Sequence, residues 1–495
     1  MNILLLSMPD SFEHMPTVAI RMPNGALVSL AGNVDPHHNV AVADLILCQD
    51  KVREKVTKLV EEHKPDILGM SIMTFQRRSA SRIADLVKTL KPDTRIVVGG
   101  YDPSLAFEDY AALPVDYIVR GEGEVTFREL LRALEKKSAL HFIAGLSHKE
   151  NGRWVHNTDR AVHSLDGDEI RLPNRKARVM QDYTLMGRKV DVIETSRGCT
   201  FDCSFCSIIE MRGRNFHTYS FDRVIADIRD ACDHGAETIF FVDDNITLDV
   251  RRFEALCNAI IEAGLHKLDY FVQGMTSAIA NHGETLAPLM HKAGFRYVFL
   301  GIENILESDL TFLKASSKNT ARDKGKKVGN ATLKAIDYLH KNHMFVVGGL
   351  IVGSPDDTVE SIEANMEFAK KYVDWPYIQH PTPYPRTPMT KDFRDQGLID
   401  NEQLHEYDGT TAVVRTKHLS ADQIEYLRWK GERGIKTKHI LPVIAHDPLF
   451  VLRNARKMMK HTYRGSTWRN MLGLEDDHKA FARYKEIRRQ EREYL

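Results

Sequence analysis

The sequence has few cysteines, no surplus of either charge and no long apolar run. Six cysteines among 495 residues are too few for a disulfide scaffold. Lys plus Arg and Asp plus Glu each number 68, so the formal net charge is zero and nucleic acid is not expected as a partner. No apolar run reaches the ~18–20 residues of a membrane span, and the N-terminal run Ile3–Leu6 is too short for a signal peptide. These features predict a cytoplasmic protein of two or three domains.

Residues 1–145 alternate short apolar runs with helical patterns, which is typical of an α/β fold with a doubly wound, Rossmann-like parallel sheet. Several predicted strands end at glycine or proline. Ligands of such sheets bind beyond the carboxyl ends of the strands, so these glycines indicate either a closely bound ligand or ordinary turns. The predicted strands are Asn2–Leu6, Val40–Leu47, Ile67–Ser71, Arg95–Val98 and Tyr117–Val119.

The rest of the chain divides into three parts. Residues 146–190 are polar and irregular and are interpreted as a small hairpin plus a linker. Residues 191–385 hold a second α/β series of about six βα units, which favours an incomplete TIM-like (β/α)6 barrel. Residues 386–495 are predicted to be mainly helical. The predicted barrel strands are Asp191–Thr195, Thr238–Val242, Tyr270–Val272, Tyr297–Leu300, Phe345–Ile351 and Tyr377–Gln379.

Half of the cysteines lie close together. Cys199, Cys203 and Cys206 fall in ETSRGCTFDCSFC, directly after a predicted strand, with the spacing C-x3-C-x2-C. Structural thiols or a zinc site would also use cysteines, but structural zinc needs four ligands and the nearest fourth candidate is His217. Three close thiolates suit a 4Fe–4S cluster that leaves one iron open for chemistry.

This cysteine pattern resembles the signature of the radical S-adenosylmethionine enzymes, CxxxCxΦC, with Phe205 at the aromatic position. The resemblance implies that Cys199, Cys203 and Cys206 ligate the cluster and that its open iron binds S-adenosylmethionine. One electron, from a donor such as flavodoxin or ferredoxin, would then cleave the sulfonium bond and release a 5′-deoxyadenosyl radical.

Further segments of residues 191–386 match the same family. Phe241–Thr247 (FVDDNIT) is similar to its second-strand segment, and Gly349–Asp356 (GLIVGSPD) is similar to its GxIxGxx(E/D) segment on the adenine side. Asp243, Asp244 and Asp356 have an alternative interpretation as helix N-caps. Arg197 is expected either to hold a cofactor carboxylate or the cluster charge, or to form a plain ion pair. The residues expected to contact S-adenosylmethionine are Phe205, Glu303, Gly349, Ile351, Gly353 and Asp356.

The N-terminal segments PDILGMS, VVGGYDP and DYIVRGEGE resemble the cobalamin-binding domain that precedes a subset of these enzymes. Tyr101 stands where that family usually has His, and Ser104 where it has Thr. The D-x-H-x-x-G motif of another cobalamin class is missing, Asp35-Pro36-His37 being the nearest string, so cobalamin is expected base-off without a histidine ligand. The alternative is a Rossmann-like domain without a cofactor. The residues expected at cobalamin are Ser71, Thr74, Gly99, Gly100, Tyr101, Gly121, Glu122 and Gly123.

The C-terminal part gives weaker signals. Tyr377, His380 and Tyr384 lie in or beside the family-like segment HPTPYPR and are expected either to face the substrate or to pack as an ordinary loop. From Arg453 onward the chain has twelve Lys/Arg against six Asp/Glu, after the apolar segment His439–Leu452. Such a region can dock on an anionic membrane, which would favour a lipid or other apolar substrate, or cover a domain seam as a solvated helix.

The resulting prediction is an oxygen-sensitive enzyme with two cofactor domains that acts on a small molecule. Its expected reaction is hydrogen abstraction followed by methyl transfer from methylcobalamin to an unactivated carbon. The alternatives are an oxidative or ring-forming reaction without methyl transfer, like that of the anaerobic porphyrin cyclase, and a non-catalytic iron–sulfur electron carrier or sensor.

Overall fold

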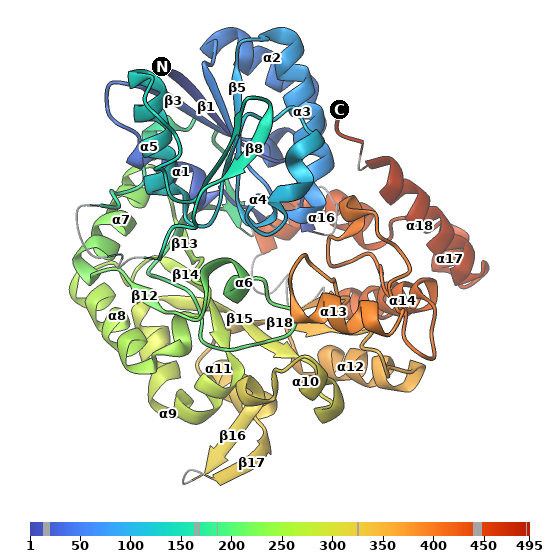
Figure 1. Ribbon diagram of the computed structural model, residues 1–495. Coiled ribbons are helices and arrows are strands. Elements are labelled where there is room, and N and C mark those ends of the chain that lie inside the picture. The colour runs from blue at the N-terminus through green and yellow to red at the C-terminus, as the bar shows by residue number, and fades with distance from the viewer. Residues whose placement is uncertain are drawn as a thin grey trace.

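The computed structural model shows two α/β units stacked on each other, with a helical C-terminal part along one side (Figure 1). It describes residues 1–12, 20–162, 165, 169–185, 187–323, 326–438, 448–491 and 493–495. The predicted fold class is confirmed: a Rossmann-like unit is followed by a partial barrel and then by helices.

The N-terminal unit is built on a seven-stranded sheet with the order β3-β1-β4-β5-β6-β7-β8. Its first five strands pair in parallel, as their near-continuous apolar sequences predict. The strands are β1 (Asn2–Ser7), β3 (Asn39–Asp44), β4 (Ile67–Ser71), β5 (Arg95–Gly99), β6 (Tyr117–Val119), β7 (Leu146–Glu150) and β8 (Arg153–His156).

Helices cover both faces of this sheet, which makes it doubly wound. One face packs its apolar side chains against α2 (Val52–His63) and α3 (Arg77–Leu90), and the other against α1 (Gly25–Asn33) and α5 (Gly123–Lys136). The short helix α4 (Tyr101–Leu105) follows β5 directly. The carboxyl ends of the strands are left open and point toward the second unit (Figure 1).

The second unit is an eight-stranded sheet with the order β19-β18-β15-β14-β13-β10-β9-β2. Its six parallel strands correspond to the six predicted barrel strands, several of which extend further than the sequence indicates. They are β10 (Arg188–Ile193), β13 (Thr238–Phe241), β14 (Asp269–Met275), β15 (Phe295–Glu303), β18 (Phe345–Ile351) and β19 (Trp375–Gln379).

The outer face of the barrel sheet packs on helices that return the chain between strands. They bury apolar side chains at helical spacing against one large core. The helices are α7 (Phe221–Asp233), α8 (Val250–Glu262), α9 (Thr276–Ala293), α11 (Thr332–Lys341) and α12 (Val359–Tyr372). The hairpin β16 (Thr320–Asp323) and β17 (Lys326–Asn330) projects below them (Figure 1).

Two connections differ from the predicted division of the chain. The hairpin β7–β8 forms where a small hairpin is predicted, but it pairs with β6 and so extends the first sheet. The strand β2 (Ile20–Arg21) comes from the N-terminal region, but it pairs with β9 (Thr184–Leu185) at the edge of the barrel sheet. Two-residue strands carry no recognisable pattern, so sequence periodicity does not reveal this exchange.

The C-terminal part consists mainly of helices, as expected. They are α13 (Pro388–Asp395), α14 (Ala421–Lys438), α16 (Pro448–Thr462), α17 (Trp468–Met471) and α18 (Asp477–Glu491). Most of the apolar segment His439–Leu452 lies outside the described residues. In the described part of the chain, no helix combines the length and apolar character that crossing a membrane requires.

Buried arginines hold the segments around the barrel in place. Arg488 of α18 bonds to Asp408 at 2.6 Å and to Glu425 at 3.1 Å, so the last helix is anchored to the barrel side. Arg175, in the segment that links the two sheets, bonds to Asp191 at 2.8 Å, Asp227 at 2.6 Å and Asp230 at 2.8 Å. Its side chain is 1% exposed, so removing it leaves the buried carboxylate of Asp227 without its ion-pair partner.

We expect Arg175→Met to lower the free energy of unfolding by about 3–5 kcal/mol, because a broken buried ion pair leaves uncompensated charge. Thermal unfolding of the purified protein measures this effect. The control is Arg489→Met, which removes an exposed pair with Glu486 and should leave the midpoint nearly unchanged. Equal midpoints for the two variants would contradict the assignment.

Candidate active site between the two sheets

A cavity of about 400 Å³ lies where the two sheets meet. The N-terminal sheet contributes the ends of β4, β5 and β6, and the barrel contributes residues just beyond β10 and β13. Both sheets therefore present the carboxyl ends of parallel strands to one space, which is where open α/β sheets bind ligands. Seven of the eight residues predicted for cobalamin line it, namely Ser71, Gly99, Gly100, Tyr101, Gly121, Glu122 and Gly123.

The glycines at this edge bring the backbone to the cavity. Gly100 has a φ of +102°, and a Cβ there would meet the backbone oxygen of Ile72 at 2.9 Å. Gly121 also has a positive φ, of +71°. A side chain would be strained at both positions, so the sequence GG…GEG keeps the strand ends bare for a large planar ligand such as a corrin.

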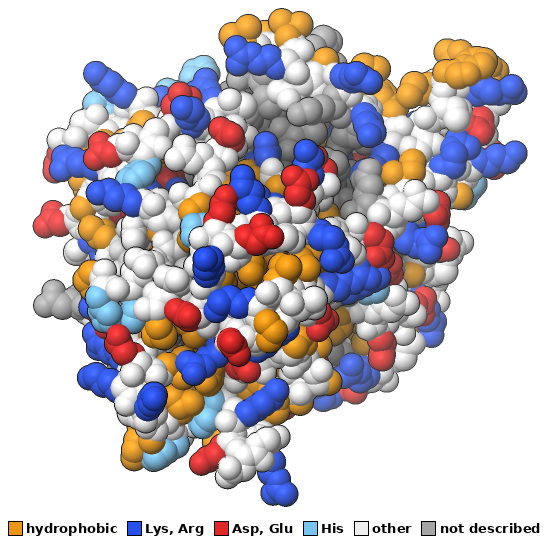
Figure 2. Space-filling model, turned by 90° about the horizontal axis from the view of Figure 1, so that it is seen from above, with side chains coloured by type: hydrophobic (Ala, Val, Ile, Leu, Met, Phe, Trp, Pro, Cys, Tyr) orange, Lys and Arg blue, Asp and Glu red, His pale blue; other side chains and the backbone are white. Residues whose placement is uncertain are grey.

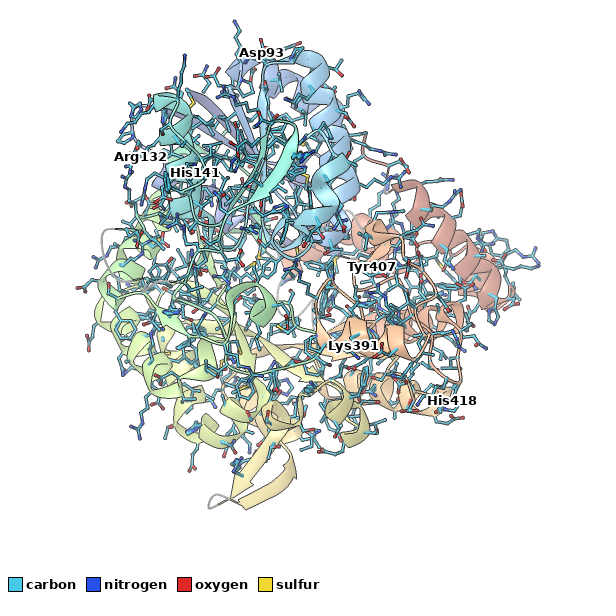
Figure 3. The ribbon with its side chains drawn as sticks, viewed as in Figure 1. Asp93, Arg132, His141, Lys391, Tyr407 and His418 are labelled. Atoms are coloured by element: carbon cyan, nitrogen blue, oxygen red, sulfur yellow. The ribbon has the colours of Figure 1, made fainter. Side chains whose placement is uncertain are left out.

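Thr74 differs from the other predicted cobalamin residues. It begins a 3-10 turn after β4, its side chain is buried, and it is not among the residues that line the cavity. Among the described residues, the lining also includes no histidine. Asp35, two residues before His37, pairs with Arg132 at 2.6 Å, and Figure 3 shows Arg132 on the outer side of the N-terminal unit, away from the cavity.

Charged side chains cross the seam beside the cavity. Arg197 bonds to Glu194 of its own strand end at 2.7 Å and to Glu124 of α5 at 2.6 Å. Burial raises the pKa of Glu124, but the charge of Arg197 more than offsets this effect and holds that pKa at about 2. Arg212, in the short helix α6 (Ile208–Arg212), bonds to Glu122 at 2.5 Å. Of the two predicted roles of Arg197, the structure shows the ion pair, and this pair joins the two units.

The loop that carries the three cysteines is fixed at both ends. At its start, Gly198 has a φ of +91°, its N–H donates to Asp244 at 2.7 Å, and an added Cβ would overlap the backbone oxygen of Asn215. In its middle, Ser204 donates to the backbone oxygens of Leu313 and Phe312, each at 3.0 Å. Only glycine fits the entry, and the loop is held against the barrel rather than left free.

The N-cap interpretation of the acidic residues is wrong. Asp249 caps α8 and Thr358 caps α12. Asp243 instead accepts hydrogen bonds from Thr195 and Ser196 and so fastens the end of β13 to the cysteine loop. Burial raises the pKa of the Asp243 carboxyl to about 7.

The thiols fit a cluster better than a single metal ion. Zinc holds thiolates at about 2.3 Å, which places two sulfurs about 3.8 Å apart in a tetrahedron. In the described part of the chain, the three sulfur atoms do not all lie within 4.8 Å of one another, with or without His217. Burial raises the pKa of Cys203 to about 11 and that of Cys206 to about 12, so these thiols need a bound cationic centre to be held as thiolates.

Two residues at this site are not predicted from the sequence. The Lys318 ammonium lies 3.3 Å from Glu303 at the end of β15 and close to the cysteines. Burial lowers its pKa, but Glu303 and the three cysteines more than offset this and raise it. The Asn245 amide contacts the sulfur of Cys199 at 3.6 Å. Asn245 lies in FVDDNIT and could have been singled out there, whereas Lys318 stands in no motif.

The Glu303–Lys318 pair offers one acceptor and one donor beside the thiols. Glu303 is a non-glycine residue with a φ of +60°, a conformation that persists where the surroundings enforce it, often at functional sites. An ammonium and a carboxylate on one ligand, as in the amino-acid part of S-adenosylmethionine, match this pair in charge. Phe205 packs nearby in the apolar cluster that includes Phe312 and Tyr384.

The predicted adenine-side segment forms the end of β18 and the turn after it. Gly349 lies over the ring of Phe299, and Gly353 turns the chain with a φ of +110°. Asp357 accepts hydrogen bonds from the N–H groups of Gly353 at 2.7 Å and Ser354 at 2.9 Å. Asp356, the residue at the family's acidic position, has a side chain that is 71% exposed and pairs with Lys417.

Asp357 has a buried carboxyl neighbour. Burial first, and then the negative charge of Asp357, raise the pKa of Asp309 to about 7. Below that pH Asp309 is protonated and adds no negative charge beside Asp357, the residue that holds the turn at Gly353.

The three predicted substrate residues are largely engaged with the protein. His380 is buried, contacts the backbone oxygen of Val352 at 3.1 Å, and has its pKa lowered to about 3 by burial. The Tyr384 hydroxyl donates to the backbone oxygen of Tyr407 at 3.1 Å, and Figure 3 shows Tyr407 beside the C-terminal helices. Tyr377 is half-buried, with its ring 5.8 Å from that of Phe299 on the inner face of the barrel.

Two family models match the chain at these two units. Residues 16–131 match the B12 binding domain, and residues 193–369 match the radical SAM superfamily. Three relatives have similar sequences. An uncharacterized methyltransferase of Pyrococcus horikoshii is 29% identical over 94% of this chain and 99% of its own length. The hopanoid C-3 methylase of Methylococcus capsulatus is 26% identical over 87% of this chain and 78% of its own length. The anaerobic magnesium-protoporphyrin IX monomethyl ester cyclase of Rubrivivax gelatinosus is 26% identical over 76% of this chain and 66% of its own length.

Solved structures show the same fold at low sequence identity. The cobalamin-dependent S-adenosylmethionine radical enzyme OxsB, with aqua-cobalamin and S-adenosylmethionine bound, has a TM-score of 0.65 and 17% identity and covers 99% of this chain and 71% of its own. The radical S-adenosylmethionine methyltransferase TsrM of Kitasatospora setae has a TM-score of 0.63 and 18% identity. The match covers 80% of this chain and 75% of TsrM.

The three thiols on the barrel and the glycine-lined cavity above them thus define a radical S-adenosylmethionine enzyme with a B12-binding domain. The chain belongs to this family and is related to the class B methyltransferases and the anaerobic magnesium-protoporphyrin cyclases. Its cofactors are a 4Fe–4S cluster, S-adenosylmethionine and cobalamin.

We expect Gly198→Ala to abolish cluster binding, because a Cβ at this position overlaps Asn215 and displaces the start of the cysteine loop. Iron and sulfide content after anaerobic reconstitution measures the loss. Gly264→Ala is the matched control, since Gly264 has a similarly positive φ of +73° but nothing within 4 Å of an added Cβ. A Gly198→Ala variant with a full complement of iron would show that the loop tolerates the displacement.

Asp309 predicts a pH dependence of stability. Its pKa is near 4 when unfolded and about 7 when folded, so between these values the folded state holds one proton more than the unfolded state. This group therefore lowers the free energy of unfolding by about 1.4 kcal/mol per pH unit as pH rises from about 5 to 7.

Asp309→Asn should remove that contribution while keeping a donor for Asp357. Urea unfolding at several pH values measures the slope. Asp85→Asn, at an exposed carboxylate of α3 in the N-terminal unit, is the control and should leave the slope as in the unmodified protein. Identical slopes for all three proteins would show that Asp309 does not hold the proton.

Proposed function

We propose that this enzyme transfers a methyl group from cobalamin to an unactivated carbon of a small apolar molecule. When bound, the cluster and S-adenosylmethionine would supply a radical that removes hydrogen from the substrate, and cobalamin would supply the methyl group, which a second S-adenosylmethionine would restore after one electron from the donor protein has reduced the cobalt. The observation that carries the proposal is that the cobalamin cavity and the cysteine loop meet at the same boundary between the two units. Glu194, Arg197 and Asp244 line the cobalamin cavity, and Gly198, which Asp244 holds, begins the cysteine loop.

The inner face of the barrel supports an apolar substrate. A lower layer of aromatic rings fills the barrel from strand to strand, with Phe240 and Phe271 4.5 Å apart and Phe271 and Tyr297 6.0 Å apart. One level closer to the strand ends, Val242, Phe299 and Val347 are only half-buried, and Val242 also lines the cavity.

This upper layer gives a flat apolar molecule a surface beneath the seam. Gln273, which pairs with Phe299 in the sheet, is a half-buried polar side chain at the same level. It offers one hydrogen-bonding group by which a mostly apolar substrate can be oriented. A small electron-transfer protein such as flavodoxin or ferredoxin is proposed to reduce the cluster.

The relatives support two outcomes of the same radical chemistry. Methylases and methyltransferases favour methyl transfer, and the magnesium-protoporphyrin cyclase is the basis of the second candidate, oxidation or ring closure without methyl transfer. Both outcomes need the same three cysteines, so the cluster site alone does not choose between them.

Labelling separates the candidates. The reduced holoenzyme, given methyl-labelled S-adenosylmethionine and an extract of apolar metabolites, is expected to form 5′-deoxyadenosine and a labelled product. A changed but unlabelled product would support the cyclase-like reaction. No cleavage of S-adenosylmethionine would support an electron carrier.

Two variants test whether the barrel cleaves S-adenosylmethionine and the N-terminal unit holds cobalamin. Cys203→Ala should lose the cluster absorbance and all cleavage of S-adenosylmethionine. Ser71→Trp, which places a large ring in the cavity, should lose bound cobalamin and label transfer but keep the cluster and the formation of 5′-deoxyadenosine. Label transfer by a cobalamin-free protein would overturn the proposed route.

A further inference from the structure

The segment between Pro448 and Leu474 combines exposed apolar side chains with positive charge. It contains six Lys/Arg and no Asp/Glu. Large apolar side chains point into solvent along it: Leu452 is 75% exposed, Leu472 68% and Trp468 66%. The others above one third exposed are Leu449, Met459, Met471 and Leu474.

The exposed residues of α16 share one side of the helix. Leu449, Leu452 and Met459 are spaced by three and seven residues, which places them on that side. Arg453, Arg456 and Lys460 are exposed on the same side, interleaved with Leu449 and Leu452. The solvent-facing half of the helix therefore combines apolar and basic side chains, and both kinds favour contact with an anionic membrane surface.

The short helix α17 continues this pattern. Trp468, Met471 and Leu472 are exposed, and Arg469 is exposed between them. Within the described residues, Arg453, Arg456, Lys460 and Arg469 form no ion pair. Figure 2 shows hydrophobic and basic side chains side by side at the projecting right-hand end of the molecule, the end at which Figure 1 places α17 and α18.

We infer that this surface, residues 448–474, docks the enzyme on an anionic lipid bilayer. The basic residues match the negative headgroups in charge, and the exposed apolar side chains can enter the boundary of the acyl chains. The rest of the C-terminal part is bound to the barrel, for example through Arg488, so docking requires no unfolding of α18. This inference does not depend on which reaction the enzyme catalyses.

The anaerobically purified holoenzyme tests the inference by sedimentation with vesicles. Binding is expected with equal parts of phosphatidylglycerol and phosphatidylcholine, with an affinity that falls as salt rises, and not with phosphatidylcholine alone. Arg453→Gln/Arg456→Gln should weaken binding by more than about tenfold, since each charge near an anionic surface contributes about fivefold. Leu452→Ser/Trp468→Ser should abolish it.

Control variants distinguish binding through this surface from nonspecific adsorption to vesicles. Phe142→Ser changes the most exposed large apolar side chain, at 84% exposure, and Lys137→Gln/Arg153→Gln removes two exposed charges, all in the N-terminal unit. These variants should bind like the unmodified protein. Trp468 should show a blue-shifted emission with vesicles, and Trp468→Phe should lose that shift while binding is kept.

Several results would overturn the inference. They are equal binding to neutral vesicles, unchanged binding by the variants of residues 448–474, and no binding to either kind of vesicle. A concentration-dependent dimer that Leu452→Ser/Trp468→Ser dissociates, without vesicle binding, would instead identify the surface as a contact between two copies of the chain.

Discussion

Everything at the active site depends on the buried pairing of Arg197 with Glu124 and Glu194 across the seam between the two sheets. Arg197 lies between the end of β10 and the first cysteine, whereas Glu124 lies in the first turn of α5 of the N-terminal unit. Because these charges are removed from water, each needs its partners, and displacing one unit would leave uncompensated charge in the interior. The pairing thus fixes the cobalamin cavity and the cysteine loop relative to each other.

The cluster site and the adenine-side segment are built in the same way, as a strand end followed by a glycine turn that a carboxylate fixes. At the cluster, Gly198 permits the turn and Asp244 holds its N–H. At the adenine-side segment, Gly353 permits the turn and Asp357 holds it. Parallel sheets leave such ends open, so the fold itself supplies the places where large ligands approach the backbone.

The fold could largely be predicted from the sequence because its strands are continuous apolar runs. Strands such as Ile67–Ser71 and Phe345–Ile351 have the predicted bounds. The cysteine cluster was equally visible, since its spacing is local. What could not be predicted depends on contacts between distant segments. Lys318 reaches the cysteines from a turn without a motif, and the acidic position Asp356 gives way to its neighbour Asp357 because only the fold decides which carboxylate turns inward.

The strand β2 has a consequence for the evolution and engineering of this protein. It is made early in synthesis, within the N-terminal unit, yet it completes the edge of a sheet whose other strands follow more than 150 residues later. The two units are therefore not separable modules. Cutting the chain between them, or exchanging the N-terminal unit for that of a relative, would remove the last strand of the barrel sheet and expose the edge of β9 to pairing with other chains.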